Sequence, residues 1–259
     1  MKQVYIDPVW LMHIQKPARY IGGEWNSVVK DHDSVELHVA LAFPDVYEVA
    51  MSHLGLKIIY SVINKRSDAL AERVYAPWVD MEALMKEKQI PLYTLESRCL
   101  VRDFDVLGFT LPYEMCYTNV LNMLHLAGIP LRTADRTEDP LVVAGGPCVY
   151  NAEPVADFFD LFFIGEAEES MGEFLETLKM WKREGRPGGR KEFLRRAAHI
   201  RGIYVPSLYE VSYEEDGRFR SIRPLADEAA LPVYKRIIQD VDHVVIDDKP
   251  ILPHIEIVH

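Results

Sequence analysis

The sequence predicts an α/β protein built on a doubly wound parallel sheet of about five strands. Three observations lead to this prediction. Short apolar runs alternate with helical patterns over about 150 residues. Several of these runs are apolar throughout, as in strands covered on both faces. No long stretch of hairpin signals interrupts the alternation, so the strands are expected to be joined by helices.

The first strand-helix unit begins at residue 35, where a β-rich run ends before Pro44 and Asp45. The helix that follows is apolar on nearly every side, which is typical of a buried helix. Two further units repeat the order. The predicted strand and helix pairs are 35–43 with 46–64, 73–78 with 79–88, and 105–111 with 114–127.

Two later strands are predicted over 141–146 and 160–165, and each carries glycine at its carboxyl end. The second leads into a helix within 166–185, in which apolar residues recur at helical spacing. Acidic residues crowd its first turn and basic residues precede Gly185, as the helix dipole favours. The domain is therefore expected to span residues 35–185.

Segments of different character flank this domain. Residues 1–34 are predicted to form an N-terminal extension. Residues 186–259 are expected to hold a linker, a short basic helix over 190–199 and a β-hairpin that turns at Asp216 and Gly217. The run 253–259 resembles a strand that is cut off, which suggests a part of a longer architecture.

Composition excludes several classes of protein. The chain has 259 residues, and 40 acidic against 29 basic residues give a net charge of −11, which disfavours direct nucleic-acid binding. No apolar run reaches the roughly 18 to 20 residues that span a bilayer, and no signal peptide is evident. We therefore expect a cytoplasmic protein without membrane contact. Cys99, Cys116 and Cys148 lack close spacing, which indicates reduced, buried thiols.

Ligands of open parallel sheets bind outside the carboxyl ends of the strands. Four loops are expected there, over 43–48, 110–115, 145–150 and 165–170. The pair Gly145 and Gly146 permits close approach of a bulky ligand to the backbone, so a flat or extended ligand could lie across this edge. The alternative is that the two glycines serve only a tight turn before a helix.

These loops carry a resemblance to a known family. Leu54-Gly55-Leu56, Gly145-Gly146-Pro147 and the Asp-x-x-x-x-Gly-Glu pattern of 160–166 occur in the order seen in cobalamin-binding-type, Rossmann-like domains. Such domains lie at the N-terminus of many radical S-adenosylmethionine (SAM) enzymes. The resemblance covers roughly residues 35–185. The stretch 15–24, QKPARYIGGE, also resembles an uncharacterised subgroup of these enzymes.

The resemblance implies a noncatalytic module that binds cobalamin beside a radical SAM barrel, which follows in cis or is a separate chain. Carried over by motif and loop position, the cofactor-binding residues are Pro44, Asp45, Tyr47, Leu54, Gly55, Thr110, Leu111, Pro112, Tyr113, Glu114, Gly145, Gly146, Pro147, Gly165 and Glu166.

Two departures from the family pattern limit what this chain does. It has no Cys-x-x-x-Cys-x-x-Cys triad, so an iron-sulfur cluster and SAM are expected only in the downstream domain. The Asp-x-His-x-x-Gly motif of histidine-ligated cobalamin domains falls on Asp45-x-Tyr47-x-x-Ala50, and a phenol is a poor cobalt ligand. Cobalamin is therefore expected to bind without a protein histidine, with Tyr47 under its ring and no metal-ligating residue.

Alternatives remain open at the level of sequence. His53 is either a satisfied core residue or a ligand, and Glu114 and Glu166 either make polar ligand contacts or cap helices. The domain could also be a scaffold that has lost the corrinoid. A flavodoxin-like or nucleotide-dependent enzyme is a third possibility, weakened by the lack of glycine-rich phosphate motifs. Substrate and reaction are not encoded in this chain.

Overall fold

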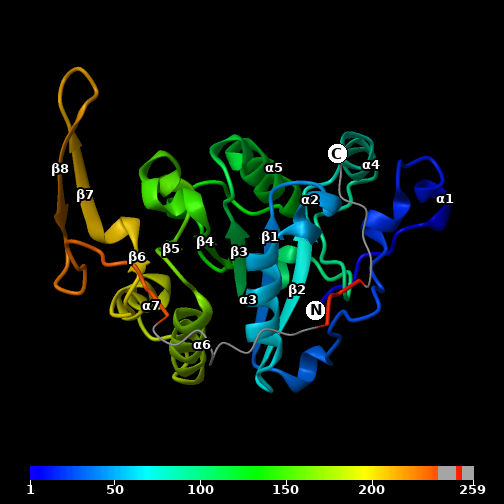
Figure 1. Cartoon of the computed structure of the whole chain (residues 1–259), viewed down its shortest axis with the longest axis horizontal. Helices are drawn as coiled ribbons and strands as arrows, with labels where there is room; N and C mark the ends of the chain where they lie inside the picture. The colour runs from blue at the N-terminus through cyan, green and yellow to red at the C-terminus, as the bar shows by residue number, and fades with distance from the viewer. Residues whose placement is uncertain (239–248, 253–259) are drawn as a thin grey trace.

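A computed structural model describes residues 1–238 and 249–252. Its centre is a six-stranded sheet in the order β2-β1-β3-β4-β5-β6 (Figure 1). The first five strands are parallel and β6 is antiparallel to β5. The strands are β1 (Leu37–Phe43), β2 (Ala69–Tyr75), β3 (Val106–Thr110), β4 (Leu141–Gly145), β5 (Leu161–Phe163) and β6 (Ile203–Tyr204).

This topology confirms the predicted doubly wound α/β sheet. The sequence missed β6, because two residues between a helix and a 3-10 turn show no periodicity. The predicted second strand over 73–78 is wrong in its bounds: β2 begins four residues earlier and ends at Tyr75, before Pro77. The apolar start of β2, Ala69-Leu70-Ala71, lies in register with β1 and extends the pairing.

Helices cover both faces of the sheet. On one face α3 and α6 lie side by side in front of the strands (Figure 1). On the other face α4 and α5 are neighbours, since Asn122 of α5 donates to Glu82 of α4 at 2.9 Å. The helices are α1 (Pro8–Leu11), α2 (Tyr47–Ser52), α3 (Leu54–Asn64), α4 (Val79–Lys88), α5 (Tyr117–Ala127), α6 (Glu168–Arg183) and α7 (Gly189–Ala198).

The helix predicted over 46–64 is broken into α2 and α3 at His53. The backbone of His53 is extended there, with ψ of 111°, and its Nδ1 accepts a hydrogen bond from the amide of Leu56 at 3.2 Å. His53 is thus the N-cap of α3 rather than a residue inside one long helix. The apolar pattern continues across the break, so periodicity alone does not reveal it.

The N-terminal segment is held against the sheet by polar contacts. Lys30 donates to the carbonyl groups of Asn64, Arg66 and Ala69 and so caps the carboxyl end of α3. The amide of Val28 donates to the hydroxyl of Tyr60 at 2.7 Å. The extension therefore closes the β2 side of the domain.

The C-terminal part adds to the same body. Helix α7 contacts α6 through aromatic rings, and Phe193 is fully buried with its ring edge-to-face on Phe174 and tilted against Trp181. Beyond β6, the predicted hairpin is present as β7 (Tyr209–Tyr213) and β8 (Phe219–Pro224), a separate two-stranded arm (Figure 1). The strand predicted over 253–259 lies outside the described residues.

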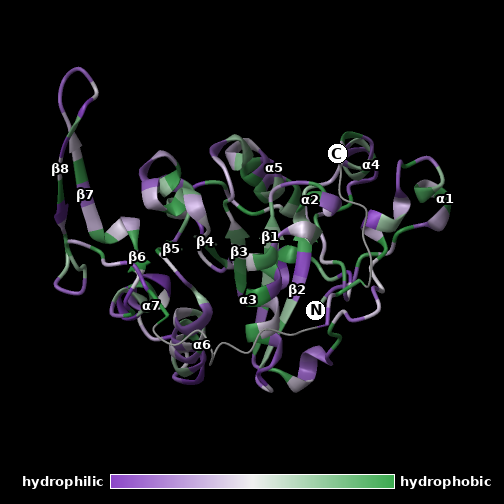
Figure 2. Ribbon diagram, viewed as in Figure 1, coloured by the Kyte–Doolittle hydropathy of each residue, from purple (hydrophilic) through white to green (hydrophobic). Residues whose placement is uncertain are grey.

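Hydropathy follows this architecture. The central strands are buried along nearly their whole length, as Figure 2 shows by their green colour. Strand β2 is the exception, since a purple stretch interrupts it where Glu72 and Arg73 lie buried. Buried charges of this kind require partners, and the N-terminal segment supplies one for each, His32 beside Glu72 and Glu24 beside Arg73.

Candidate functional site

A cavity of about 210 Å³ lies over the carboxyl halves of the central strands. Its two walls are the first turns of α3 and α6, the helices that cover this face. Leu56, Ile59, Phe163 and Met171 make its surface mainly apolar. A planar, uncharged group is the kind of ligand that such a surface favours.

Glycines create this space. Gly55, Gly108, Gly145, Gly146 and Gly165 all line the cavity. A Cβ added at Gly145 would meet nothing closer than Phe163 Cβ at 3.9 Å, and one added at Gly108 would touch Leu41 and Val143 at 3.6 Å. Side chains at these two positions would therefore fit sterically but fill the cavity.

Gly146 has a different reason to be glycine. Its φ is +104°, and a Cβ there would lie 2.8 Å from the carbonyl oxygen of Leu111. The amide of Leu111 in turn donates to the carbonyl of Gly145 at 2.8 Å, and that of Cys148 donates to Leu111 at 3.2 Å. The pair is thus divided, with Gly145 bordering open space and Gly146 allowing two loops to pack closely.

His53 places an imidazole in the cavity wall. Its ring lies 5.1 Å from that of Phe43, and burial lowers the pKa of His53. Because Nδ1 accepts the cap hydrogen bond from Leu56, the neutral ring carries its proton on Nε2. His53 is therefore oriented to donate a hydrogen bond, with one ring nitrogen already used by the backbone.

Gly165 and Glu166 contact a segment from farther along the chain. Arg236 forms a β-bridge with Gly165, and its amide donates to the carbonyl of Ile164 at 2.8 Å. A Cβ at Gly165 would lie 2.2 Å from the carbonyl oxygen of Arg236. The carboxylate of Glu166 accepts from the amide of Ile238. Gly165 and Glu166 thus line the cavity and also bind the segment that contains Arg236 and Ile238.

The loops that follow β1 and β3 contact each other at the carboxyl edge of the sheet. The hydroxyl of Tyr113 donates to the carboxylate of Asp45, which also accepts from the amide of Val46 at 2.7 Å. Asn119 of α5 donates to the carbonyl of Pro44 at 2.9 Å. In a sheet of order 2-1-3-4-5 this junction of β1 and β3 is the topological switch point where ligands bind.

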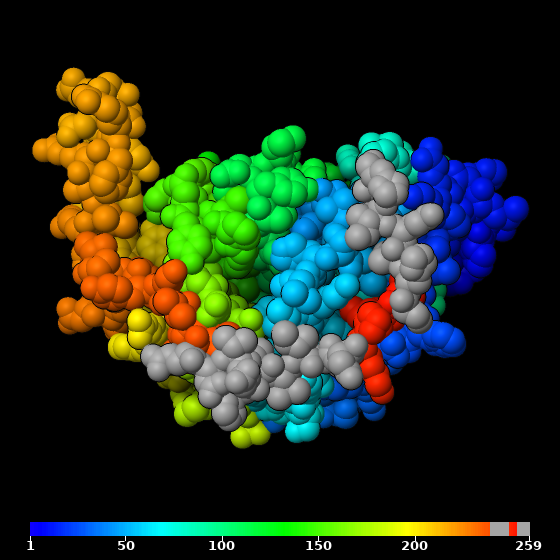
Figure 3. Space-filling view, viewed as in Figure 1, coloured from blue at the N-terminus to red at the C-terminus, as the bar shows by residue number. Residues whose placement is uncertain are grey.

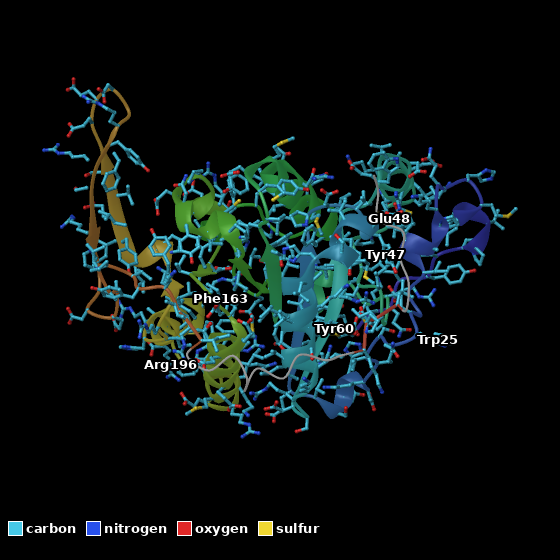
Figure 4. The ribbon with its side chains drawn as sticks, viewed as in Figure 1. Trp25, Tyr47, Glu48, Tyr60, Phe163 and Arg196 are labelled. Atoms are coloured by element: carbon cyan, nitrogen blue, oxygen red, sulfur yellow. The ribbon has the colours of Figure 1, made fainter. Side chains whose placement is uncertain are left out.

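Tyr47 points away from the cavity toward the N-terminal segment. Figure 4 shows Tyr47, at the start of α2, well apart from Phe163 at the end of β5. The hydroxyl of Tyr47 donates to Glu24 at 3.1 Å, and Glu24 in turn lies 3.0 Å from the guanidinium of Arg73. Arg73 also binds Glu96 at 2.6 Å, and burial raises the pKa of Glu96. This buried cluster holds the hydroxyl of Tyr47.

The structure brings together six of the residues carried over from the family: Gly55, Thr110, Gly145, Gly146, Gly165 and Glu166. Others lie at the rim or beneath it. Leu54 and Tyr113 are exposed, whereas Leu111 is fully buried. The remaining residues that do not line the cavity are Pro44, Asp45, Tyr47, Pro112, Glu114 and Pro147.

Sequence reasoning missed several cavity residues. Gly108 and Phe163 lie inside predicted strands, and only the strand register shows that they face the same side as Leu41 and Val143. Alternation along the strands could have indicated this face. The position of His53 depends on the helix break, which the continuous apolar pattern does not signal.

Metal-binding and thiol chemistry are not evident in the described part of the chain. Across residues 1–238 and 249–252 no three His, Cys, Asp or Glu side chains are arranged to hold a metal ion. Cys99, Cys116 and Cys148 are free and buried, and burial raises the pKa of Cys116 to about 11. Within the same ranges, no helix has the length and apolarity needed to cross a bilayer.

The fold and the cavity define a doubly wound α/β module with a binding recess at its carboxyl edge. The sequence model of the family described as "Radical SAM proteins, N-terminal" matches residues 55–206. This range contains every strand from β2 to β6, all of α6 and α3 except its first residue. The chain therefore belongs to the family of N-terminal regions of radical SAM proteins.

Two further comparisons give weaker similarities. The uncharacterized protein MJ0966 of Methanocaldococcus jannaschii is 28% identical over 134 residues, which are 51% of this chain and 24% of that protein. The chain thus matches about a quarter of its relative's length. The radical SAM methyltransferase TsrM of Kitasatospora setae, solved with tryptophan and a SAM analogue, is 15% identical with a TM-score of 0.37, covering 70% of this chain and 29% of that one.

Proposed function

We propose that this chain is the cofactor-binding module of a radical SAM protein and that it binds cobalamin at the carboxyl edge of its sheet. The observation that carries the proposal is the glycine-lined cavity between α3 and α6. The catalytic region, with its iron-sulfur cluster and SAM, is the proposed partner of the module. A bound corrinoid would supply a cobalt centre to that region.

The residues present fit part of this cofactor. A cavity of about 210 Å³ is smaller than the roughly 300 to 1,000 Å³ of sites that enclose a whole drug-sized ligand. It suits a flat bicyclic group such as the base that ends the nucleotide tail of cobalamin. The macrocycle would then lie outside, against the exposed side chains of Leu54, Tyr113 and Met115 at the carboxyl edge.

His53 would contact the inserted group. Because its Nδ1 holds the amide of Leu56, only the Nε2 proton is free to meet a ligand, as a hydrogen-bond donor. Coordination of cobalt by His53 would require the other tautomer and the loss of the cap bond. The proposed binding mode therefore involves no protein histidine on the metal.

A flavin is the second candidate, since the strand order 2-1-3-4-5 is also that of flavodoxin. Its phosphate would have to lie at the loop after β1. That loop carries the carboxylate of Asp45, whereas Glu48 in the first turn of the helix that follows is paired with Lys16 and Arg19. Negative charge at this position disfavours a phosphate, so the loop favours cobalamin over a flavin mononucleotide.

The proposal is tested by anaerobic reconstitution of the chain with hydroxocobalamin, followed by gel filtration and absorbance. We expect near-stoichiometric retention, and a spectrum without a histidine-ligated cobalt. Gly145→Val should reduce the affinity at least tenfold, because its side chain would occupy the cavity. Gly172→Leu is the matched control, since it adds a side chain to α6 where no atom lies within 4 Å.

The outcomes separate the candidates. Loss of cobalamin in Gly145→Val with retention in Gly172→Leu would support the proposal. Failure of the wild-type chain to retain cobalamin, with retention of flavin mononucleotide, would favour the flavodoxin-like function. Retention of neither would indicate a scaffold that has lost its cofactor.

A further inference from the structure

The arm formed by β7 and β8 has one apolar and one polar face. Residues opposite each other in an antiparallel pair share a face. The pairs Tyr209–Pro224 and Val211–Ile222 therefore lie on one face, which we call the inner face. Tyr213, two residues after Val211, continues this face and pairs with Phe219 beyond a bulge that follows Ser212. On the outer face Glu210 forms an ion pair with Arg223, and the hydroxyls of Ser212 and Ser221 lie 2.7 Å apart.

The inner face begins as part of the protein core. The ring of Tyr209 lies 5.0 Å from that of Tyr204 in β6, and Ile222 contacts the main core. The pKa of Tyr204 is raised, first by burial and then by Glu153, with further contributions from the phenols of Tyr209 and Tyr213. Tyr213 thus lies on the side of the arm that faces the body.

Toward the tip the inner face is uncovered. Tyr213 is 54% exposed and Phe219 is 60% exposed. A two-stranded ribbon alone is marginally stable in water, and it needs further strands or a packed surface to persist. Figure 3 shows a notch between the arm and the rest of the upper edge. The arm therefore presents an aromatic surface that nothing within the described residues covers.

The opposite wall of this notch belongs to the carboxyl edge. The hydroxyl of Tyr204 donates to Glu153, which begins the 3-10 turn η7 (Glu153–Phe158). The preceding turn, η6 (Pro147–Asn151), carries Tyr150, which is 62% exposed. Both turns follow β4, whose last residue is Gly145 in the cavity. The notch is thus continuous with the edge that holds the proposed cofactor site.

We propose that the inner face of the arm docks the radical SAM catalytic region and holds it against the carboxyl edge. This inference rests on the proposed function for the identity of the partner. The family is defined as the N-terminal part of larger proteins, and this chain matches only 24% of its relative in Methanocaldococcus jannaschii. Proteins of this family can therefore contain a large further region that could occupy the notch. Because the inner face is turned toward the body of the domain, a partner that contacts it would lie in the notch beside the carboxyl edge of the sheet.

The test titrates the 259-residue chain with a separately produced catalytic region. Phe219→Ser and Tyr213→Ser remove exposed inner-face rings, and each should weaken association at least tenfold. Arg223→Gln and Ser221→Ala on the outer face are the matched controls and should change it less than twofold. Each variant should remain folded, since exposed positions tolerate substitution. Circular dichroism checks this.

A second measurement does not depend on association between separate chains. Hydrogen exchange of the β7 and β8 amides should slow at least tenfold when the module is joined to the catalytic region. Equal effects of inner and outer substitutions, or unchanged exchange, would overturn the proposal. Self-association of the chain that Phe219→Ser abolishes would assign the face to a second copy instead. Cobalamin retention is measured separately, so docking without cofactor would leave this inference standing while the proposed function fails.

Discussion

At the scale of single residues, the two roles of His53 are coupled. Its Nδ1 caps α3 and its ring lines the cavity, so protonation would remove the cap acceptor and place a charge among apolar neighbours. Burial lowers the pKa of His53 in the folded state. The unfolded state therefore binds the proton more tightly, and the stability contributed by neutral His53 is present above pH 6.5 and lost as the pH falls below it.

His53→Asn should remove this pH dependence while keeping a cap, because asparagine is a good N-cap residue. Near pH 8 the variant and the wild type should unfold at similar urea concentrations, and below pH 6.5 the variant should be the more stable. His53→Ala is the control: it has neither cap nor imidazole, and relative to His53→Asn it should cost about 1 kcal/mol at every pH. Parallel pH profiles for wild type and His53→Asn would contradict this account.

At the scale of elements, the N-terminal segment is fixed by close backbone contact as well as by ion pairs. Gly22 and Gly23 both have positive φ, +63° and +80°. A Cβ at Gly22 would lie 2.1 Å from the carbonyl oxygen of Leu95. A Cβ at Gly23 would have no neighbouring atom within 4 Å. Substitution of Gly23 therefore tests the cost of the left-handed backbone alone, and substitution of Gly22 tests that cost together with a steric clash.

Gly23→Ala should destabilise the protein by about 1 to 2 kcal/mol, the cost of a left-handed backbone. Gly22→Ala should cost about 1 to 3 kcal/mol more, because the segment must move away from Leu95. Free energies of unfolding from urea titration measure both. Equal losses in the two variants would show that the contact with Leu95 contributes nothing.

At the scale of the whole molecule, the extension and the sheet share a group of buried charges. Arg73 lies 1% exposed between Glu24 of the extension and Glu96. Lys16 and Arg19 bind Glu48 at the start of α2. Removing one partner of a buried charge group is costly because the remaining charges stay buried and unpaired.

Deletion of residues 1–30 should therefore abolish the cooperative urea transition or lower its midpoint strongly. Glu24→Gln, which retains the segment and one carbonyl oxygen as an acceptor, should cost less than the deletion. The measurement is fluorescence-detected urea unfolding of the three proteins. A deletion variant that unfolds at the wild-type midpoint would show that the extension is an independent appendage.

Much of the fold was predictable because its signals are local. Apolar runs identified five strands of the sheet, and glycines after them marked the carboxyl edge. The site was predictable only in part. Gly145 and Gly146 are adjacent and both line the cavity, yet only a Cβ at Gly146 would collide with the backbone of Leu111. Tyr47 was expected beneath a ligand, yet its hydroxyl binds Glu24, which is 23 residues away in the sequence.

The sequence by itself determined the α/β class, the parallel strands and the edge at which a ligand would bind. Only the tertiary structure decided which side chains face the cavity, that β6 joins the sheet, and that the arm has an uncovered aromatic face. The physical reason is that periodicity and turn chemistry report on each segment and its own solvent exposure. The direction of a loop side chain, by contrast, is set by which distant backbone and charge it meets after folding.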